Sequence, residues 1–213
     1  MPHPAYNPVT DFERVLEQYT GATYAITTDN CSNAMFMALT YEGIKEKEIT
    51  IPAHTYMSTP CSIIHAGGQI AFDKSMNEPD GYLKGAYPLR GSKTFDSALT
   101  FTKGMWSRFP KGSFVCLSFS GPRKHLKLGK GGAILTDSQD AMEWFKLARY
   151  SGRHEVSHET DQFAMVGWNY YMLPEIAARG NVLMLDQRDN EDLCFKYQDL
   201  SGYEIYTGAN RDA

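Results

Sequence analysis

The stretch GSFVCLSFSGPRKHLKLGKGGAILT, residues 112–136, is the part of this sequence that decides the fold. Two apolar runs, at residues 113–119 and 131–135, have the length and composition of β-strands. Between them lies a polar segment that contains basic residues together with glycine and proline, which is typical of a loop. The cations are Arg123, Lys124, Lys127 and Lys130. The pattern predicts a strand, an exposed basic loop and a second strand.

A basic loop between two strands is ordinarily a solvated connection, and composition alone favours that interpretation. The order of residues also fits a chemical role, since small residues end the first strand and G-x-G-G opens the second. A lysine at the mouth of a sheet, partly desolvated and beside other cations, has a lowered pKa. Such a lysine can form a Schiff base with an aldehyde, so a lysine of this loop is a candidate for covalent chemistry.

The same stretch resembles a motif of the DegT/DnrJ/EryC1/StrS family of pyridoxal-phosphate-dependent sugar aminotransferases, roughly S-F-x-x-x-K-x-x-x-x-G-E-G-G-A. Ser118 and Phe119 begin the matching segment, and the glycines that end it stand at the family's spacing. Counting back from those glycines selects Lys124 rather than Lys127 or Lys130, with one residue inserted after Ser118. The resemblance implies that Lys124 carries pyridoxal 5′-phosphate and that Ser118 lies beside it.

The resemblance also favours transamination over dehydration. In the related sugar dehydratases a histidine occupies the position of the lysine, and His125 is one residue too late to fill it. Lys130 departs from the family, which has an acidic residue there.

Two further blocks that match the family precede the basic loop. Asn30 and Ser32 are good cap residues for a following helix, and small residues at a helix start favour a bound anion. In the family this block contacts the cofactor phosphate, which implies that role for Cys31 and Ser32.

The family's P-x-x-T-aromatic-x-x-T pattern matches residues 52–59 and implies that Tyr56 stacks on the pyridine ring. Without the resemblance, an aromatic residue at this position would be read as a packing residue.

Asp96 and Asn169 complete the residues that the resemblance assigns. Asp96 ends an expected strand, and the family's aspartate pairs with the pyridinium nitrogen so that the ring remains an electron sink. Leu99 replaces the polar fourth residue of that motif. Asn169 matches an asparagine that reaches across a homodimer interface to the partner's cofactor phosphate, although an Asn before a helix is ordinarily a cap. Tyr171 stands where the family has arginine.

Composition limits the class of protein. The 213 residues, 42% hydrophobic and 13% aromatic, suffice for one core. A net charge of −4 with mixed signs gives no basis for binding nucleic acid. The cysteines are far apart, and no export signal, long apolar run or zinc-like ligand cluster is present. We therefore expect a cytoplasmic protein without a metal or a membrane partner.

Periodicity and cap residues predict the other elements. Helices are expected over 11–19, from Asn30 to residue 43, over 138–150 and, as a polar helix, over 183–200. Residues 73–91 are expected to be irregular because they are rich in proline, glycine and charge.

The resemblance implies an α/β protein of the fold type I, aspartate-aminotransferase-like class, with a reduced, mixed and mostly parallel sheet flanked by helices. Residues 1–200 would form one reduced cofactor-binding large domain, and residues 201–213 a short tail. The family's small C-terminal domain would be absent.

The implied function is transfer of an amino group from an amino acid, glutamate or glutamine, to a nucleotide-linked keto-sugar by a homodimer with shared active sites. Lys124 would act as acid and base, and Asp96 would support the ring's positive charge. An alternative is a reduced homologue, catalytically weak or inactive, that binds the cofactor or a partner. A glycine-rich nucleotide-binding domain is less favoured, because G-K-G-G opens a strand and lacks the P-loop and dinucleotide fingerprints.

Overall fold

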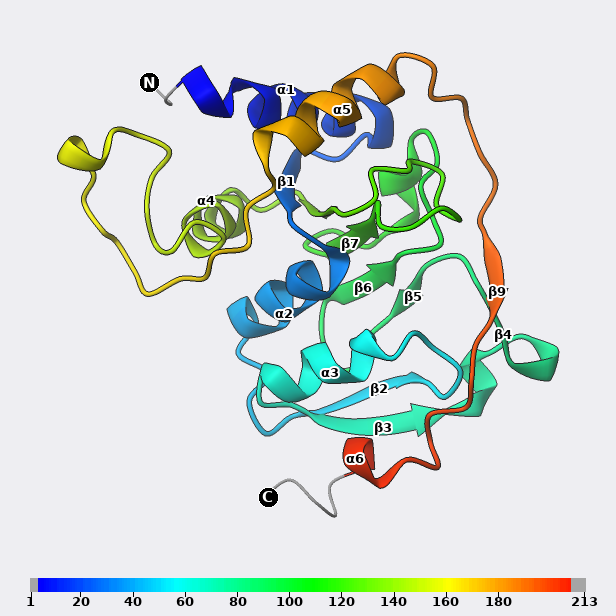
Figure 1. The fold of residues 1–213 in the computed structure, drawn as a ribbon. Helices are drawn as coiled ribbons and strands as arrows, with labels where there is room; N and C mark the ends of the chain where they lie inside the picture. Colours follow the sequence, from blue (N-terminus) through cyan, green and yellow to red (C-terminus); the bar gives the residue numbers. More distant parts are fainter. Residues whose placement is uncertain (1–3, 208–213) are drawn as a thin grey trace.

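The computed structural model describes residues 4–207, which are built around a five-stranded sheet (Figure 1). In spatial order the strands are β1 (Tyr24–Thr28), β8 (Gly132–Thr136), β7 (Phe114–Ser118), β6 (Thr94–Ser97) and β5 (Tyr87–Pro88). The two strands predicted on either side of the basic loop are β7 and β8, which are neighbours in this sheet.

Strand directions correct part of the expected topology. β8 lies between β1 and β7 and is antiparallel to both, while β5 is antiparallel to β6. Within the described residues, β6 and β7 form the parallel pairing of this sheet. The prediction of a mixed sheet is confirmed, but "mostly parallel" is wrong for its pairings. The cause is the basic loop, which returns the chain at the same edge, whereas a parallel neighbour needs a crossover connection.

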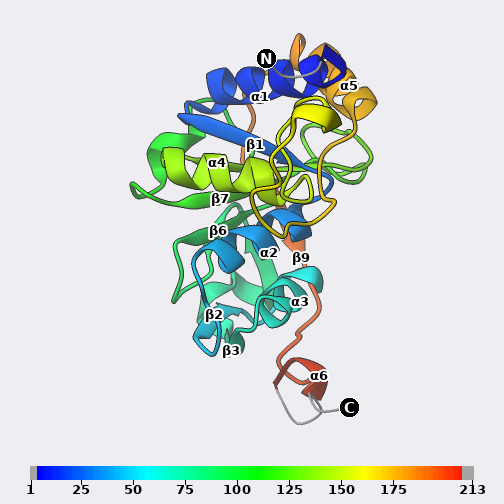
Figure 2. The ribbon, with the colours of Figure 1, turned by 90° about the vertical axis from the view of Figure 1, so that its left-hand side faces the viewer.

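Helices cover both faces of the sheet. One face carries α1 (Asn7–Thr20) and α5 (Pro174–Met184), and the other carries α2 (Cys31–Tyr41) and α4 (Gln139–Ala148), as Figures 1 and 2 show. Along β7, Val115 and Leu117 belong to the core beneath α1, while Phe114 and Cys116 belong to the core beneath α2. This alternation is the two-residue period of a strand, and burial on both faces explains why β7 is apolar from Phe114 to Leu117.

Cap residues explain most of the helix ends. α1 begins at Asn7, earlier than predicted, because Pro8 is tolerated in the first turn, where its missing N–H is not needed. Gly21 ends the same helix with a φ of 79°. Asn30, a predicted cap of α2, and Ser138, the first residue of the helix expected over 138–150, each accept a hydrogen bond from a first-turn backbone N–H.

A smaller parallel pair of strands lies beside the main sheet. β2 (Glu48–Pro52) and β3 (Gln69–Asp73) are connected by α3 (Ser58–His65), so the three form a β–α–β unit. Ile49, Ile51 and Ile63 are fully buried in the core of this unit.

Two segments differ from the prediction. Residues 73–91 are not irregular, because they contain η2 (Lys74–Met76), η3 (Pro79–Gly81), β4 (Tyr82–Lys84) and β5. The polar helix expected over 183–200 does not form: α5 ends at Met184, and β9 (Cys194–Lys196) pairs antiparallel with β4. Burial alternates along 194–199, which is the period of a strand rather than of a helix.

After α5, the chain runs down one side of the molecule to α6 (Glu204–Thr207), which lies against β3 (Figure 1). The rings of Phe72 and Tyr206 are 6.4 Å apart there. Part of the predicted tail, residues 208–213, lies outside the described residues. The remaining short helices are η1 (Pro4–Tyr6), η4 (Met105–Arg108) and η5 (His158–Thr160). Between residues 4 and 207, no helix has the length and apolar character needed to cross a membrane.

Candidate active site

The basic loop, residues 119–131, is anchored rather than free. Phe119 N–H donates to the carbonyl oxygen of Gly131 at 2.9 Å, which closes the base of the loop. Leu126 and Leu128 are buried in the core beneath α1. These contacts hold Lys124 in a defined position near the edge of the sheet.

A cavity of about 360 Å³ lies beside this loop, where β6 and β7 end. The carboxyl ends of parallel strands are where α/β sheets usually place their ligands. Six of the predicted site residues line the cavity: Cys31, Ser32, Tyr56, Asp96, Ser118 and Lys124. They come from four separate parts of the chain, so the fold brings together residues that the sequence shows only as isolated blocks.

Lys124 is the half-buried cation of the cavity. Its Nζ donates to the carbonyl oxygen of Ala98 at 2.7 Å. Burial lowers the pKa of Lys124, the charge of Asp96 opposes that change, and Arg123 adds to it. A lysine with a lowered pKa has a larger uncharged fraction near neutral pH, which is the form that attacks an aldehyde.

Asp96 is a buried carboxylate that accepts hydrogen bonds at both of its oxygens. Its Oδ1 accepts from Ala98 N–H at 2.9 Å, and its Oδ2 accepts from Tyr87 Oη at 2.6 Å and Thr59 Oγ1 at 3.1 Å. Burial and the charge of Asp96 raise the pKa of Tyr87 well above its usual value, so this phenol remains a donor. These three donors fix the carboxylate at the cavity wall.

The start of α2 forms another wall of the cavity. Ser32 Oγ donates to Ser58 Oγ at 2.7 Å, and both residues line the cavity. A Cβ on Gly132 would lie 2.6 Å from the backbone nitrogen of Cys31, so the absence of a side chain there lets β8 approach α2. Burial raises the pKa of the Cys31 thiol, which keeps it neutral. The helix start therefore presents uncharged donors and the positive end of a helix dipole to the cavity.

Tyr56 lies at the rim of the cavity, just before α3. The side chain is 53% exposed, and its ring centre is 6.4 Å from that of Tyr197. An aromatic face this open to solvent is free to stack on a flat ligand.

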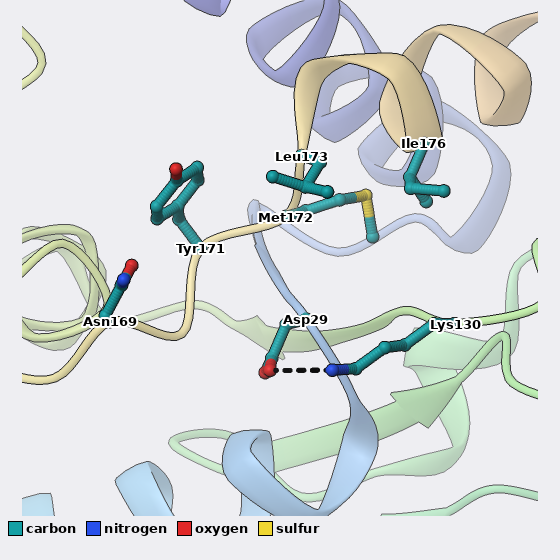
Figure 3. A pocket seen from close by; sticks show the side chains of 7 residues that line it. All are labelled: Asp29, Lys130, Asn169, Tyr171, Met172, Leu173 and Ile176. Atoms are coloured by element: carbon teal, nitrogen blue, oxygen red, sulfur yellow. Dashed lines mark ion pairs between the residues drawn. The ribbon is translucent and has the colours of Figure 1, made fainter.

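Asn169 does not line this cavity. It lies in a second pocket of about 240 Å³ with Tyr171, beside the ion pair between Lys130 and Asp29, whose charged atoms are 3.5 Å apart (Figure 3). Asn169 forms a β-bridge with Tyr150, and α5 begins five residues later with Leu173 as its cap position. Asn169 is therefore not a helix cap.

The structure adds several residues to the cavity for which the sequence predicted no role in the site. They are Ser58, Ser120, Arg123, Phe195 and Tyr197. Phe195 and Tyr197 belong to the extended C-terminal segment, and the alternation of aromatic and polar residues along 195–198 was the sequence signal that could have identified them. Burial, with a contribution from the charge of Asp96, raises the pKa of Tyr197 to about 12.

The cavity fits pyridoxal 5′-phosphate. The fit rests on a lysine with a lowered pKa, a buried carboxylate, a helix start with hydroxyl groups, and an exposed aromatic ring around one space. Within residues 4–207, no group of three or more His, Cys, Asp or Glu side chains could hold a metal ion.

Comparison with known proteins assigns the fold to the class of fold type I PLP-dependent transferases, as the sequence predicted. A structure of 3-amino-5-hydroxybenzoic acid synthase matches with a TM-score of 0.65 and 17% identity over 84% of this chain and 56% of that chain. The Helicobacter pylori aminotransferase PseC, involved in the biosynthesis of pseudoaminic acid, matches with a TM-score of 0.66 and 15% identity over 85% and 58%. DesV from S. venezuelae, solved with a ketimine intermediate, matches with a TM-score of 0.62 and 19% identity over 84% and 56%.

The resemblance to one family is also confirmed. Residues 4–75 match the model of the DegT/DnrJ/EryC1/StrS aminotransferase family. No curated protein matches the sequence. The chain spans a little more than half the length of the solved structures described above, and the members of this family are PLP-dependent aminotransferases.

Proposed function

We propose that this protein is a PLP-dependent aminotransferase that moves an amino group from an amino acid, glutamate or glutamine, to a nucleotide-linked keto-sugar. The observation that carries the proposal is the placement of Lys124 and Asp96 in one cavity at the end of β6 and β7. Their charges interact there, since Asp96 raises the pKa of Lys124 against the lowering caused by burial. A balanced reaction needs no external oxidant, because the donor exchanges its amino group and α-hydrogen for the carbonyl oxygen of the sugar.

The bound cofactor would supply an aldehyde and an electron-accepting ring. Lys124 would hold it through Nζ and, once displaced by the donor, would take a proton from the donor's α-carbon and return it at the cofactor. Asp96, held by its donors, would pair with the ring nitrogen. Tyr56 would cover one face of the ring and help to exclude water.

We assign the phosphate of the cofactor to Cys31 and Ser32 at the start of α2, with Ser118 beside it. Asn169, in its separate pocket, would serve the cofactor of a partner subunit in a homodimer. Residues 1–200 would act as a single reduced cofactor-binding domain, and the protein would work in the cytoplasm without a metal, nucleic acid or membrane partner. The resemblance supports these proposals, and the cavity lining supports those for Cys31, Ser32 and Ser118.

The test is to add pyridoxal phosphate, record the absorbance spectrum, reduce with borohydride and map the modified peptide. Reduction fixes the cofactor on the lysine that holds it, so we expect one adduct, on Lys124. Prior addition of glutamate or glutamine should bleach the absorbance band and prevent the adduct. Lys127→Met is the matched control, because Lys127 lies in the same loop outside the cavity lining. An adduct that persists in Lys124→Met, or is spread over Lys127 and Lys130, contradicts the proposal.

A second candidate is a reduced homologue that binds the cofactor without turnover. It is favoured by Leu99, which is 2% exposed in the core beside β2 rather than in the cavity. Formation of the Lys124 adduct without any effect of amino donors would support this candidate.

A further inference from the structure

Arg123 is a cation at the mouth of the cavity, next to Lys124 in the chain. Its guanidinium carbon lies 4.6 Å from the ring centre of Phe195, within the range of a cation–π contact. The charged residues that line the cavity, among those the structure describes, are Arg123, Lys124 and Asp96. Asp96 accepts hydrogen bonds from three uncharged donors, and Arg123 has no ion pair within residues 4–207. Arg123 is therefore an exposed positive charge available to an anion.

The segment that carries Phe195, the ring against which Arg123 packs, is anchored at both ends. We call residues 189–200 the strap. Near its start, Asp192 accepts hydrogen bonds from both terminal nitrogens of Arg108, at 3.0 and 2.6 Å. Near its end, Asp199 pairs with Lys74 at 2.8 Å. Between these anchors β9 pairs with β4, so Phe195 is held in place and Arg123 is held with it.

We propose that Arg123 binds the α-carboxylate of the amino donor, a proposal that rests on the function proposed above. The amino group and the carboxylate of an amino acid are attached to the same carbon, so a donor that reacts at Lys124 brings its carboxylate to the neighbourhood of the next residue. A guanidinium offers two parallel N–H groups that match a carboxylate. Arg123 thus selects donors that carry a carboxylate beside the amine.

The cofactor phosphate has a different place in the cavity. The start of α2, with Ser32 and Ser58, offers uncharged donors and a helix dipole to a phosphate. That wall is built by α2, β8 and α3, whereas Arg123 belongs to the loop and rests on the strap. The cavity therefore offers two separate anion sites: the start of α2 for the cofactor phosphate, and Arg123 for the carboxylate of the donor.

Binding of glutarate, which is glutamate without its amino group, tests this proposal without turnover. Calorimetric titration of the cofactor-loaded protein would compare the wild type with Arg123→Gln, Arg123→Lys and Lys127→Gln. We expect Arg123→Gln to weaken glutarate binding by about ten-fold to a hundred-fold, as the loss of a charge-assisted contact does. The glutarate affinity of Arg123→Lys should lie between those of the wild type and Arg123→Gln, because lysine keeps the charge and loses the paired N–H groups. Lys127→Gln should match the wild type.

Borohydride trapping on Lys124 accompanies every variant and separates this proposal from the proposed function. If trapping persists in Arg123→Gln and glutarate binds as in the wild type, or if the wild type binds no glutarate, the role of Arg123 is wrong and the proposed function stands. If Arg123→Gln loses trapping, and inorganic phosphate rather than glutarate distinguishes it from the wild type, Arg123 binds the cofactor phosphate instead. If the wild type is not trapped, the proposed function fails independently of Arg123. In a turnover assay, the KM for the donor should rise in Arg123→Gln far more than kcat falls.

Discussion

At the scale of single residues, the cavity is governed by the balance of charge around Lys124. Burial favours the neutral amine, and Asp96 favours the ammonium. Since Lys124 and Asp96 come from separate blocks of the sequence, their mutual effect depends on the fold that brings them together.

Asp96→Asn removes the charge that opposes the effect of burial on Lys124. The pKa of Lys124 should therefore fall further below that of an ordinary lysine, and the uncharged fraction at a given pH should rise. The measurement is the pH dependence of the rate at which pyridoxal phosphate is captured on Lys124, read by borohydride trapping. The midpoint should move to lower pH. Asp140→Asn, at an exposed position in α4, is the control, and an unchanged or raised midpoint in Asp96→Asn would contradict the argument.

Much of the site could be predicted from the sequence, because the resemblance lies in short blocks at fixed spacing. The blocks around Ser32, Tyr56, Asp96 and Lys124 all reach one cavity. Arg123 could not be selected in this way. It is distinguished by its place in the cavity lining and by its contact with Phe195, and that contact joins residues far apart in the sequence.

At the scale of elements, the strap determines how the cavity is closed on one side. Its short strand, β9, pairs with β4 across more than half the length of the chain. Short polar segments do not reveal such a pairing, and the composition of residues 183–200 suited a helix as well. The helices with clear caps, α2 and α4, were predicted more accurately because their signals are local.

The strap should loosen in acid. The pKa values of Asp192 and Asp199 are both lowered, first by hydrogen bonds from Arg108 and Lys74 respectively. Because the folded-state pKa values lie below those of the unfolded chain, this stabilisation is present above about pH 4 and is lost as the pH falls through the folded values. Hydrogen exchange of the β9 amides, corrected for the intrinsic effect of pH, should accelerate in acid before exchange of the α2 amides does.

Asp192→Asn provides the same test at neutral pH. It removes the carboxylate charge that accepts the hydrogen bonds of Arg108. Protection of the β9 amides from hydrogen exchange should therefore fall by about ten-fold, while protection of the α2 amides stays unchanged. Equal loss of protection in both elements would show that the strap does not open as a separate unit.

At the scale of the whole molecule, a buried ion pair joins elements from both halves of the chain. Arg149, at the end of α4, is fully buried and donates to Glu13 of α1. It also donates to the carbonyl oxygen of Thr27 in β1 at 2.7 Å and to Glu155 at 2.8 Å. α1 and α4 cover opposite faces of the sheet, so this pair connects the two layers of helices.

Arg149→Met should strongly destabilise the protein, by about 3–5 kcal/mol, because it leaves the charge of Glu13 buried without its main partner. The double variant Glu13→Gln with Arg149→Met should recover much of that loss. Urea denaturation followed by circular dichroism measures both free energies of unfolding. If the single and double variants are equally unstable, lost packing rather than an unpaired charge is the cause.

The position of the strap, C-terminal to the basic loop, has a consequence during synthesis. Lys124 leaves the ribosome roughly 70 residues before Tyr197, which corresponds to about 4–15 s at typical elongation rates. Throughout that interval the nascent chain can already contain Asp96 and the basic loop, while the wall formed by Phe195 and Tyr197 has not yet been made. Cofactor that arrives during translation would meet an open groove, and synthesis of the strap would then enclose it.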